Sequence, residues 1–234
     1  MSRVVLVTGG NRGIGLSIAR KFDALGDIVI VTSRSGEPID GLNVVQCDVT
    51  STESVEAAFA TIEAKFGTVE VAIANAGITK DKLLVRMVDE DIDDVLNTNL
   101  VGAIRVARRA TRAMTQARSG RIIFVSSVVA LMGSAGQVNY AASKSGLVGA
   151  ARSLAREIGS RGVTINVIAP GFVDTDMTAE LSEDRKAQIV ANIPLARYGS
   201  SSEVADAVAF LASADAAYIT GAVIPVDGGL GMGH

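Results

Sequence analysis

The chain has 234 residues, of which 48% are hydrophobic, and a formal net charge of −3 at pH 7. This length suits one α/β domain, and the negative charge gives no overall attraction to nucleic acid or to an anionic membrane. The single cysteine, Cys47, excludes an internal disulfide and a thiolate metal cluster, and no apolar stretch approaches the roughly 20 residues of a membrane span. We therefore expect a soluble, cytoplasmic protein that binds neither nucleic acid nor membrane.

Short runs rich in β-branched residues alternate along the chain with longer segments of helix length. Seven of these runs are predicted strands: RVVLVT, DIVIVT, LNVVQC, VEVAIA, GRIIFVSS, GVTINVIAP and GAVIPV. Because strands and helices alternate, and because several strands are apolar throughout, we predict a parallel sheet with helices on both faces. The expected fold is a doubly wound, seven-stranded, three-layer αβα sandwich in a single domain, residues 1–234.

The widest gap between predicted strands runs from Gly171 to Gly221. It holds a polar segment, residues 174–186, and a predicted helix at residues 202–213. An insertion after the carboxyl end of a strand overhangs the edge where open α/β sheets bind ligands. We expect residues at about 174–198 to form a substrate lid.

A glycine-rich segment, VTGGNRGIG, follows the first predicted strand and begins a helix. Glycines at this position let the backbone approach a pyrophosphate, which free N–H groups at a helix N-terminus stabilise. The alternative is a tight structural turn without a ligand. The loop residues expected to contact a dinucleotide are Gly9, Asn11, Arg12, Gly13, Ile14 and Gly15.

Two arginines indicate which dinucleotide binds. NAD-binding proteins of this architecture usually have an acidic residue after the second strand, where it binds the ribose 2′-hydroxyl. Here the segment VTSRSG offers Arg34, and Arg12 lies in the glycine loop. Guanidinium groups bind a 2′-phosphate through charge-assisted hydrogen bonds. The sequence therefore favours NADP(H), and the alternative is that either arginine is only a solvated surface charge.

The stretch NYAASKSG places Tyr140 and Lys144 four residues apart, on one face of a predicted helix. A neighbouring ammonium lowers the pKa of a phenol from its usual value near 10 toward the neutral range where acid–base groups work best. Alone, such a pair is more often a packed tyrosine and a solvated lysine. Here Ser127 ends the fifth strand, and Asn99 is predicted to begin the helix before that strand. This context favours a catalytic site.

Together these motifs resemble the short-chain dehydrogenase/reductase family, and they match it in order from Val7 to Gly229. The matching segments are TGxxxGxG, CDVT, ANAG with Ala74 in place of the usual asparagine, NTNL, the YxxxK pair and PGxxxT. The resemblance implies a Rossmann-like fold and further cofactor contacts. These contacts are Asp48, Val49, Asn75, Ala76, Gly77, Tyr140, Lys144, Pro170, Gly171, Val173 and Thr175.

The resemblance also implies roles for four residues. Tyr140 would exchange the proton with the substrate oxygen, and Ser127 would hydrogen-bond that oxygen. Lys144 would bind the nicotinamide ribose and lower the pKa of Tyr140, and Asn99 would hold a water of the proton relay. No metal is needed for this reaction.

Within the family the chain looks most like bacterial 3-oxoacyl-[acyl-carrier-protein] reductases, which make (3R)-hydroxyacyl thioesters with NADPH in fatty acid biosynthesis. The alternatives are an acetoacetyl-CoA reductase or another secondary alcohol dehydrogenase, and, in another class, a non-catalytic NADP(H)-sensing module. The lid sequence would distinguish the other reductases and dehydrogenases. A sensing module would be recognised by loss of the tyrosine or the lysine.

Acyl carrier protein is acidic, so its receptor needs a basic patch. Arg118 and Arg161 stand where those reductases use arginines for carrier docking, by resemblance. The stripe Arg105, Arg109 and Arg112 is expected to form a subunit contact, a wider docking patch or a solvated face. The family commonly forms homotetramers, which we expect here.

Overall fold

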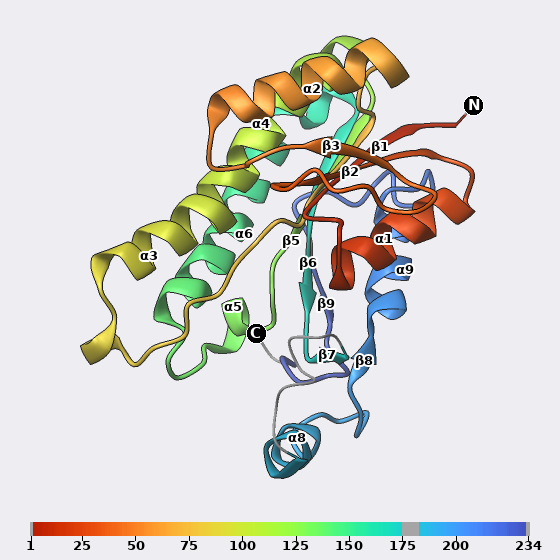
Figure 1. Ribbon diagram of the computed structural model, residues 1–234. Coiled ribbons are helices and arrows are strands. Elements are labelled where there is room, and N and C mark those ends of the chain that lie inside the picture. Colours follow the sequence, from red (N-terminus) through yellow and green to blue (C-terminus); the bar gives the residue numbers. More distant parts are fainter. Residues whose placement is uncertain (1, 175–182, 233–234) are drawn as a thin grey trace.

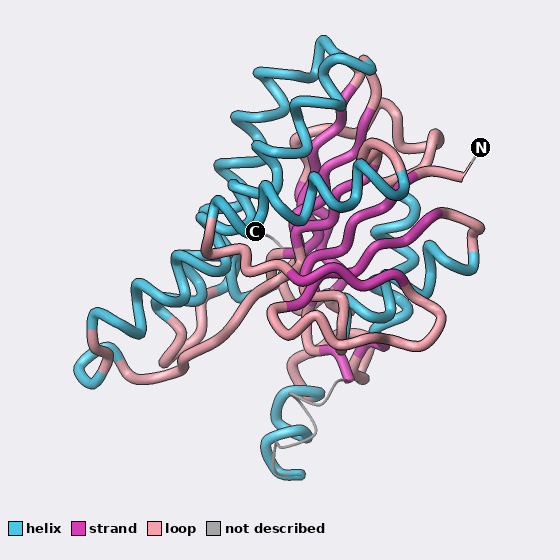
Figure 2. Tube along the Cα trace, turned by 45° about the horizontal axis from the view of Figure 1, so that its top comes forward, coloured by secondary structure: helices cyan, strands magenta, loops and turns pink. Residues whose placement is uncertain are grey.

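The computed structural model describes residues 2–174 and 183–232. A sheet of seven parallel strands runs through the centre, in the order β3-β2-β1-β4-β5-β6-β9 (Figures 1 and 2). These are the seven predicted strands, and the Rossmann-like α/β fold is confirmed. The strands are β1 (Val4–Thr8), β2 (Ile28–Ser33), β3 (Asn43–Gln46), β4 (Val71–Ala74), β5 (Gly120–Val125), β6 (Val163–Pro170) and β9 (Val223–Val226).

Helices cover both faces of the sheet. In Figure 1, α2, α4 and α6 lie on one side and α1 and α9 on the other. The helices are α1 (Gly13–Ala24), α2 (Thr52–Phe66), α3 (Asp89–Leu96), α4 (Ala103–Ala117), α5 (Val129–Met132), α6 (Val138–Ile158), α8 (Glu183–Val190) and α9 (Ser201–Leu211). Among the described residues, no helix combines the length and the apolarity that crossing a membrane requires.

The apolar strands fill two cores, one on each face of the sheet. Every residue of β1 and β6 is buried. On β1, Val4 and Leu6 pack in the layer of α2, α4 and α6, whereas Val5 and Val7 pack in the layer of α1 and α9. Because successive side chains of a strand point to opposite faces, a strand covered on both faces is mainly apolar, and the buried Asn166 of β6 is satisfied by hydrogen bonds with Ile219 and Ala222.

The chain order creates a switch point between β1 and β4. From β1 the chain moves outward through β2 to β3, and then returns to place β4 on the other side of β1. In open α/β sheets, ligands bind beyond the carboxyl ends of the strands at such a point. The loops that follow β1, β2, β3 and β4 therefore meet where the dinucleotide site is predicted.

Two arginines of the α4 stripe form ion pairs with α2. Arg109 donates two hydrogen bonds to the Glu63 carboxylate of α2, at 2.9 and 2.6 Å, and one to Glu56 at 2.8 Å. Its guanidinium carbon lies 4.9 Å from the centre of the Phe59 ring, and its side chain is 12% exposed. Arg112 also pairs with Glu56, at 3.3 Å. Arg109 and Arg112 therefore link α4 to α2 within the chain, and the subunit or docking role expected for the stripe stays a prediction.

A second, two-stranded sheet, which the sequence did not predict, closes the base of the segment expected to form the lid. It pairs β7 (Val173–Asp174) with β8 (Gly199–Ser200), in parallel. Between them the structure describes α8 and the chain that follows it. Thr175 and the rest of residues 175–182 lie outside the described residues, so the lid stays a prediction.

Candidate active site

The glycine loop joins β1 to α1 at the carboxyl edge of the sheet. Gly9 and Gly13 have φ angles of +62° and +53°, a region that residues with a side chain rarely adopt. A Cβ on Gly15 would lie 2.4 Å from the Gly9 carbonyl oxygen. Arg12 precedes α1, and its side chain caps none of the helix N–H groups. Compact backbone and a helix N-terminus without a side-chain cap are what a pyrophosphate requires, so these residues fit a dinucleotide.

The ends of β1 and β4 are fastened to each other beneath this loop. The Asn75 side-chain amide donates to the carbonyl oxygens of Thr8 and Gly9, each at 3.0 Å. The Thr8 hydroxyl accepts from the N–H groups of Asn75 and Ala76, each at 3.1 Å. The Asn75 side chain therefore holds the glycine loop in place. Thr8 is missing from the predicted site, although its position in the TGxxxGxG pattern points to it.

Arg12 and Arg34 are both exposed. Neither guanidinium forms a hydrogen bond or ion pair with another residue in the described part of the chain. Arg34 lies near Asp48, whose carboxyl pKa is lowered mainly by hydrogen bonds from Thr50 and additionally by the charge of Arg34. Two guanidinium groups near the predicted ribose site, without a hydrogen-bond partner among the described residues, are suited to bind the ribose 2′-phosphate of NADP(H).

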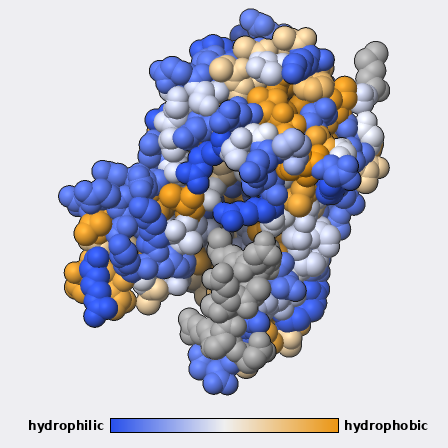
Figure 3. Space-filling view, viewed as in Figure 1, coloured by the Kyte–Doolittle hydropathy of each residue, from blue (hydrophilic) through white to orange (hydrophobic). Residues whose placement is uncertain are grey.

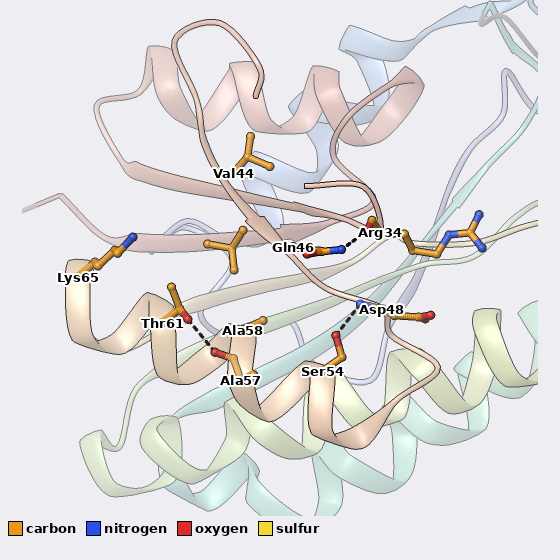
Figure 4. A pocket seen from close by; sticks show the side chains of 10 residues that line it. Arg34, Val44, Gln46, Asp48, Ser54, Ala57, Ala58, Thr61 and Lys65 are labelled. Atoms are coloured by element: carbon orange, nitrogen blue, oxygen red, sulfur yellow. Dashed lines mark hydrogen bonds between the residues drawn. The ribbon is translucent and has the colours of Figure 1, made fainter. Parts of the chain in front are cut away.

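A groove of about 570 Å³ lies between the edge strand β3 and α2 (Figure 4). In Figure 4 the Arg34 and Asp48 side chains extend at one end, and Lys65 lies at the other. The lining contains none of the predicted catalytic residues, so the groove adjoins only the Arg34 end of the candidate site. Its lining residues are Arg34, Val44, Val45, Gln46, Asp48, Ser54, Ala57, Ala58, Thr61 and Lys65.

Tyr140 and Lys144 share one face of α6, as the sequence predicts. The Lys144 Nζ lies 5.7 Å from the centre of the Tyr140 ring. Lys144 is only 4% exposed, and its ammonium donates to the Val125 carbonyl at 2.8 Å. The Ser126 hydroxyl donates to the Lys144 carbonyl at 2.9 Å. The end of β5 therefore fixes α6 beside the loop that carries Ser127.

Burial controls the protonation of this pair. It raises the pKa of Tyr140 above its usual 10, while hydrogen bonding with Ser127 lowers it by less and the charge of Asp81 raises it slightly. Burial also lowers the pKa of Lys144 to about 8. The prediction that Lys144 brings the phenol pKa down is therefore wrong for the protein without ligands, because desolvation dominates. The phenol is protonated at neutral pH and able to donate.

Asn99 lies within a π-helical turn, η2 (Asn97–Gly102), between α3 and α4, and not at the start of a helix as predicted. Its side-chain amide donates to the Ile78 carbonyl at 2.9 Å and to the Ser143 hydroxyl at 3.1 Å. Its Oδ1 accepts from the Ile78 N–H at 2.8 Å. Both amide hydrogens are occupied, so a relay water held by Asn99 would have to donate to Oδ1, which has a second lone pair, or bind the main chain. The sequence prediction missed Ser143, for which spacing gives no signal.

Two neighbouring glycine positions show how tightly the remaining loops pack. A Cβ on Gly77 would lie 3.2 Å from Asn99 Oδ1 and 3.4 Å from Lys144 Nζ, so the loop after β4 passes directly over this pair. A Cβ on Gly171 would lie 2.7 Å from the Asp227 Cα. The predicted cofactor residues of these loops therefore border the catalytic cluster.

The turn after β6 lies against the loop that carries Ser127. The Pro170 carbonyl accepts from the Val128 N–H at 2.8 Å, and the Gly171 N–H donates to the Val226 carbonyl at 3.0 Å. Val173 is buried in β7. In the described part of the chain, no group of three or more histidine, cysteine, aspartate or glutamate side chains is placed to hold a metal ion.

Arg118 and Arg161 lie together at the opposite edge of the sheet. They precede β5 and β6, and the Arg118 guanidinium donates to the Ser160 carbonyl at 3.2 Å. Tyr140 is near the start of α6, and Arg161 follows its end. At 1.5 Å per residue the 21-residue helix puts about 30 Å between them. The predicted docking arginines are therefore remote from the Tyr140 of their own chain.

Comparisons with known proteins extend over essentially the whole chain. A family model described as enoyl-(acyl carrier protein) reductase matches residues 9–231. The 3-oxoacyl-[acyl-carrier-protein] reductase MabA is 53% identical over 234 residues both in Mycobacterium avium and in Mycobacterium tuberculosis H37Rv. These matches cover 100% of this chain and 92% and 95% of those proteins.

The 3-oxoacyl-[acyl-carrier-protein] reductase FabG of Escherichia coli K12 is 47% identical over 238 residues, and the match covers 98% of each chain. The aligned lengths leave no part of the sheet or of the site outside the similarity. The protein therefore belongs to the short-chain dehydrogenase/reductase family, whose reductases use a nicotinamide cofactor.

Proposed function

We propose that the protein reduces a 3-oxoacyl thioester, presented on acyl carrier protein, to the (3R)-3-hydroxyacyl thioester with NADPH, in fatty acid biosynthesis. The observation that carries the proposal is the placement of the Tyr140 phenol beside Ser127 and near the buried Lys144, whose Nζ lies 5.7 Å from the ring centre, in a chain whose relatives are reductases of this kind. A secondary alcohol dehydrogenase with another substrate would use the same groups, so the substrate assignment rests on the relatives.

Each catalytic residue has a task that its surroundings support. Tyr140 donates its proton to the carbonyl oxygen as that oxygen becomes an alkoxide, and burial keeps the phenol protonated until then. Ser127 hydrogen-bonds the same oxygen. Lys144, held by the Val125 carbonyl, presents its ammonium to the ribose hydroxyls. Asn99 fixes the loop after β4 through both polar groups of Ile78. A bound reduced nicotinamide supplies the hydride.

The proposed choice of NADPH depends on Arg12 and Arg34. Both guanidinium groups lack a partner among the described residues and are free to bind a 2′-phosphate. We expect Arg34→Glu to raise the KM for NADPH at least tenfold, since one charge-assisted hydrogen bond is lost and a repulsion is added, while the KM for NADH changes little. Arg152→Glu, at an exposed position of α6, is the matched control. Equal losses with both cofactors would contradict the phosphate-binding role.

The activity is tested by following NADPH absorbance with acetoacetyl-acyl carrier protein, acetoacetyl-CoA and a panel of ketones. Tyr140→Phe should lower kcat by about 10²–10⁴-fold and leave the Kd for NADPH within a few fold, because only the proton donor is lost. Reduction at the wild-type rate by this variant would refute the mechanism. Tight NADPH binding without turnover of any carbonyl would favour a sensing module instead.

We also propose a homotetramer. Exposed apolar side chains occur on both helices that flank β5: Val101 next to α4 and Ile104 in it, and Val138 in α6, are 39–50% exposed. Figure 3 shows further apolar side chains at the left tip, over the η1 turn (Leu84–Arg86), where Leu84 is 59% and Val85 90% exposed. Such surfaces are usually covered by a partner. Sedimentation as a monomer at micromolar concentration would contradict this assembly.

Carrier docking then has to occur between copies. Since Arg118 and Arg161 lie at the edge opposite Tyr140, we propose that they guide the carrier to the Tyr140 of another copy. Reversing both charges should raise the KM for a carrier-linked substrate at least tenfold and leave a small β-ketoester unaffected. Equal losses on the two substrates would refute docking.

A further inference from the structure

The π-helical turn η2 supports the loops that follow two different strands. After β4, the main chain of Ile78 is held in both directions by Asn99. After β3, Val49 packs on the turn: a Cβ on Gly102 would lie 2.8 Å from Val49 Cγ2 and 3.1 Å from its carbonyl oxygen. π-Helical turns of this kind often occur at functional sites. This one touches the predicted adenine side and the predicted catalytic side at once.

Arg105 ties the first of these loops to the turn. Its Nη1 donates to the side-chain oxygen of Asn97 at 2.9 Å and to the Val49 carbonyl at 3.3 Å. The charge of Arg105 also helps to hold the pKa of Asp48 below its usual value, after the larger effects of the Thr50 hydrogen bonds and of Arg34. Arg105 therefore joins two segments of its own chain, a role that its place in the stripe did not suggest.

From the same turn, hydrogen bonds continue to the catalytic tyrosine. Asn99 donates to the Ser143 hydroxyl at 3.1 Å, and that hydroxyl donates to the Tyr140 carbonyl at 2.7 Å. Asn99 and Ser143 are 1% and 0% exposed, so water does not compete with these bonds. These contacts form one continuous series. It runs from Val49 through Arg105 to Asn97 in η2, and from Asn99 of the same turn through Ser143 to Tyr140.

We propose that Arg105 is a positioning residue that couples cofactor binding at the Asp48–Val49 loop to the placement of Tyr140, through the π-helical turn. The inference rests on the proposed cofactor site. A guanidinium suits this task because its planar group holds both N–H bonds of Nη1 in fixed directions, toward Asn97 and Val49, whereas the ammonium of a lysine rotates freely. When the loop is ordered by a ligand, Arg105 and Asn97 transmit that order to Asn99 and so to α6.

The test compares Arg105→Met, which keeps the apolar stem, with Arg105→Lys and with Arg108→Met, an exposed neighbour on α4. Two readouts are independent of turnover: the Kd for NADPH, and hydrogen exchange at the Ile78 amide in the protein without cofactor. In Arg105→Met we expect about tenfold weaker binding and about tenfold faster exchange at Ile78, as for the loss of one charged hydrogen bond. Arg105→Lys should be intermediate, and Arg108→Met should match wild type.

A third readout separates coupling from simple contact with the adenosine part. Reduced nicotinamide mononucleotide lacks that part, yet its kcat/KM should still fall in Arg105→Met if the turn positions Tyr140. Weaker NADPH binding, with wild-type Ile78 exchange and wild-type mononucleotide rates, would overturn the coupling. Unchanged binding and exchange would overturn it as well.

If Arg105→Met does not fold, Asn97→Ala removes the other end of the bridge and is measured in the same way. The binding and exchange results decide the coupling even if no 3-oxoacyl substrate is reduced. Failure of this inference and failure of the proposed function are therefore distinguishable.

Discussion

Replacing Lys144 with methionine should change how the stability of the protein depends on pH. The ammonium is 4% exposed and donates to the Val125 carbonyl, and burial lowers its pKa from 10.5 to about 8. At pH values between about 8 and 10.5, Lys144 is protonated in the unfolded chain and deprotonated in the folded chain. The free energy of unfolding therefore rises with pH across this window, and below pH 8 the buried charge destabilises the fold.

The two pKa values set the magnitude. Each pH unit in the window contributes roughly 1.4 kcal/mol, and the full window about 3 kcal/mol. About 2–3 kcal/mol of this falls between pH 7 and pH 10, because the titration curves overlap the ends of the window. Lys144→Met carries no titrating group at this position, so the unfolding free energy of wild type should gain about 2–3 kcal/mol relative to that of the variant over this range.

Urea unfolding of both proteins at pH 7 and pH 10, at matched protein concentration, measures this change. Groups that titrate elsewhere contribute equally to both proteins, and the Val125 carbonyl loses its donor in the variant at both pH values. These effects cancel in the comparison. If the free energies of unfolding of wild type and variant differ by the same amount at both pH values, the lowered pKa of Lys144 is refuted.

Three further predictions follow from the same geometry. The kcat/KM for reduction should fall as pH rises through about 8, because Lys144 loses the charge that binds the ribose; a flat profile from pH 7 to pH 10 would contradict this. Gly15→Ala should weaken NADPH binding at least tenfold in a fluorescence titration, since its Cβ would meet the Gly9 carbonyl, whereas Gly159→Ala, with no neighbour within 4 Å, should bind normally. Arg109→Met should lower the free energy of unfolding by about 1–2 kcal/mol in urea, and an unchanged midpoint would show that its ion pairs contribute nothing.

The sequence predicted the sheet well because its signals are local. Apolar runs such as those of β1 and β6 alternate with helices, and that alternation implies parallel strands covered on both faces. The glycine loop and the Tyr140–Lys144 pair were found for the same reason, since both are short patterns. The β7–β8 pair was missed because two residues per strand are too few to form a pattern.

The misplaced features depend on partners far along the chain. Asn99 was predicted to begin a helix, yet it lies inside a continuous helical segment, and both polar groups of its side chain bond to Ile78, 21 residues earlier. The acceptors of Arg109 are 46 and 53 residues away. The raised pKa of Tyr140 comes from burial, which no short pattern reveals.

The β7–β8 pairing fixes both ends of the segment that joins these two strands. Val173 and Gly199 sit side by side, so the chain between them leaves and rejoins the body at nearly one point. Since the entropic cost of closing a loop grows slowly with its length, such an excursion can be shortened, lengthened or exchanged while every strand of the main sheet keeps its register. Transplanting it between relatives therefore tests whether this segment sets acyl-chain preference, while the β7–β8 pair stays in place.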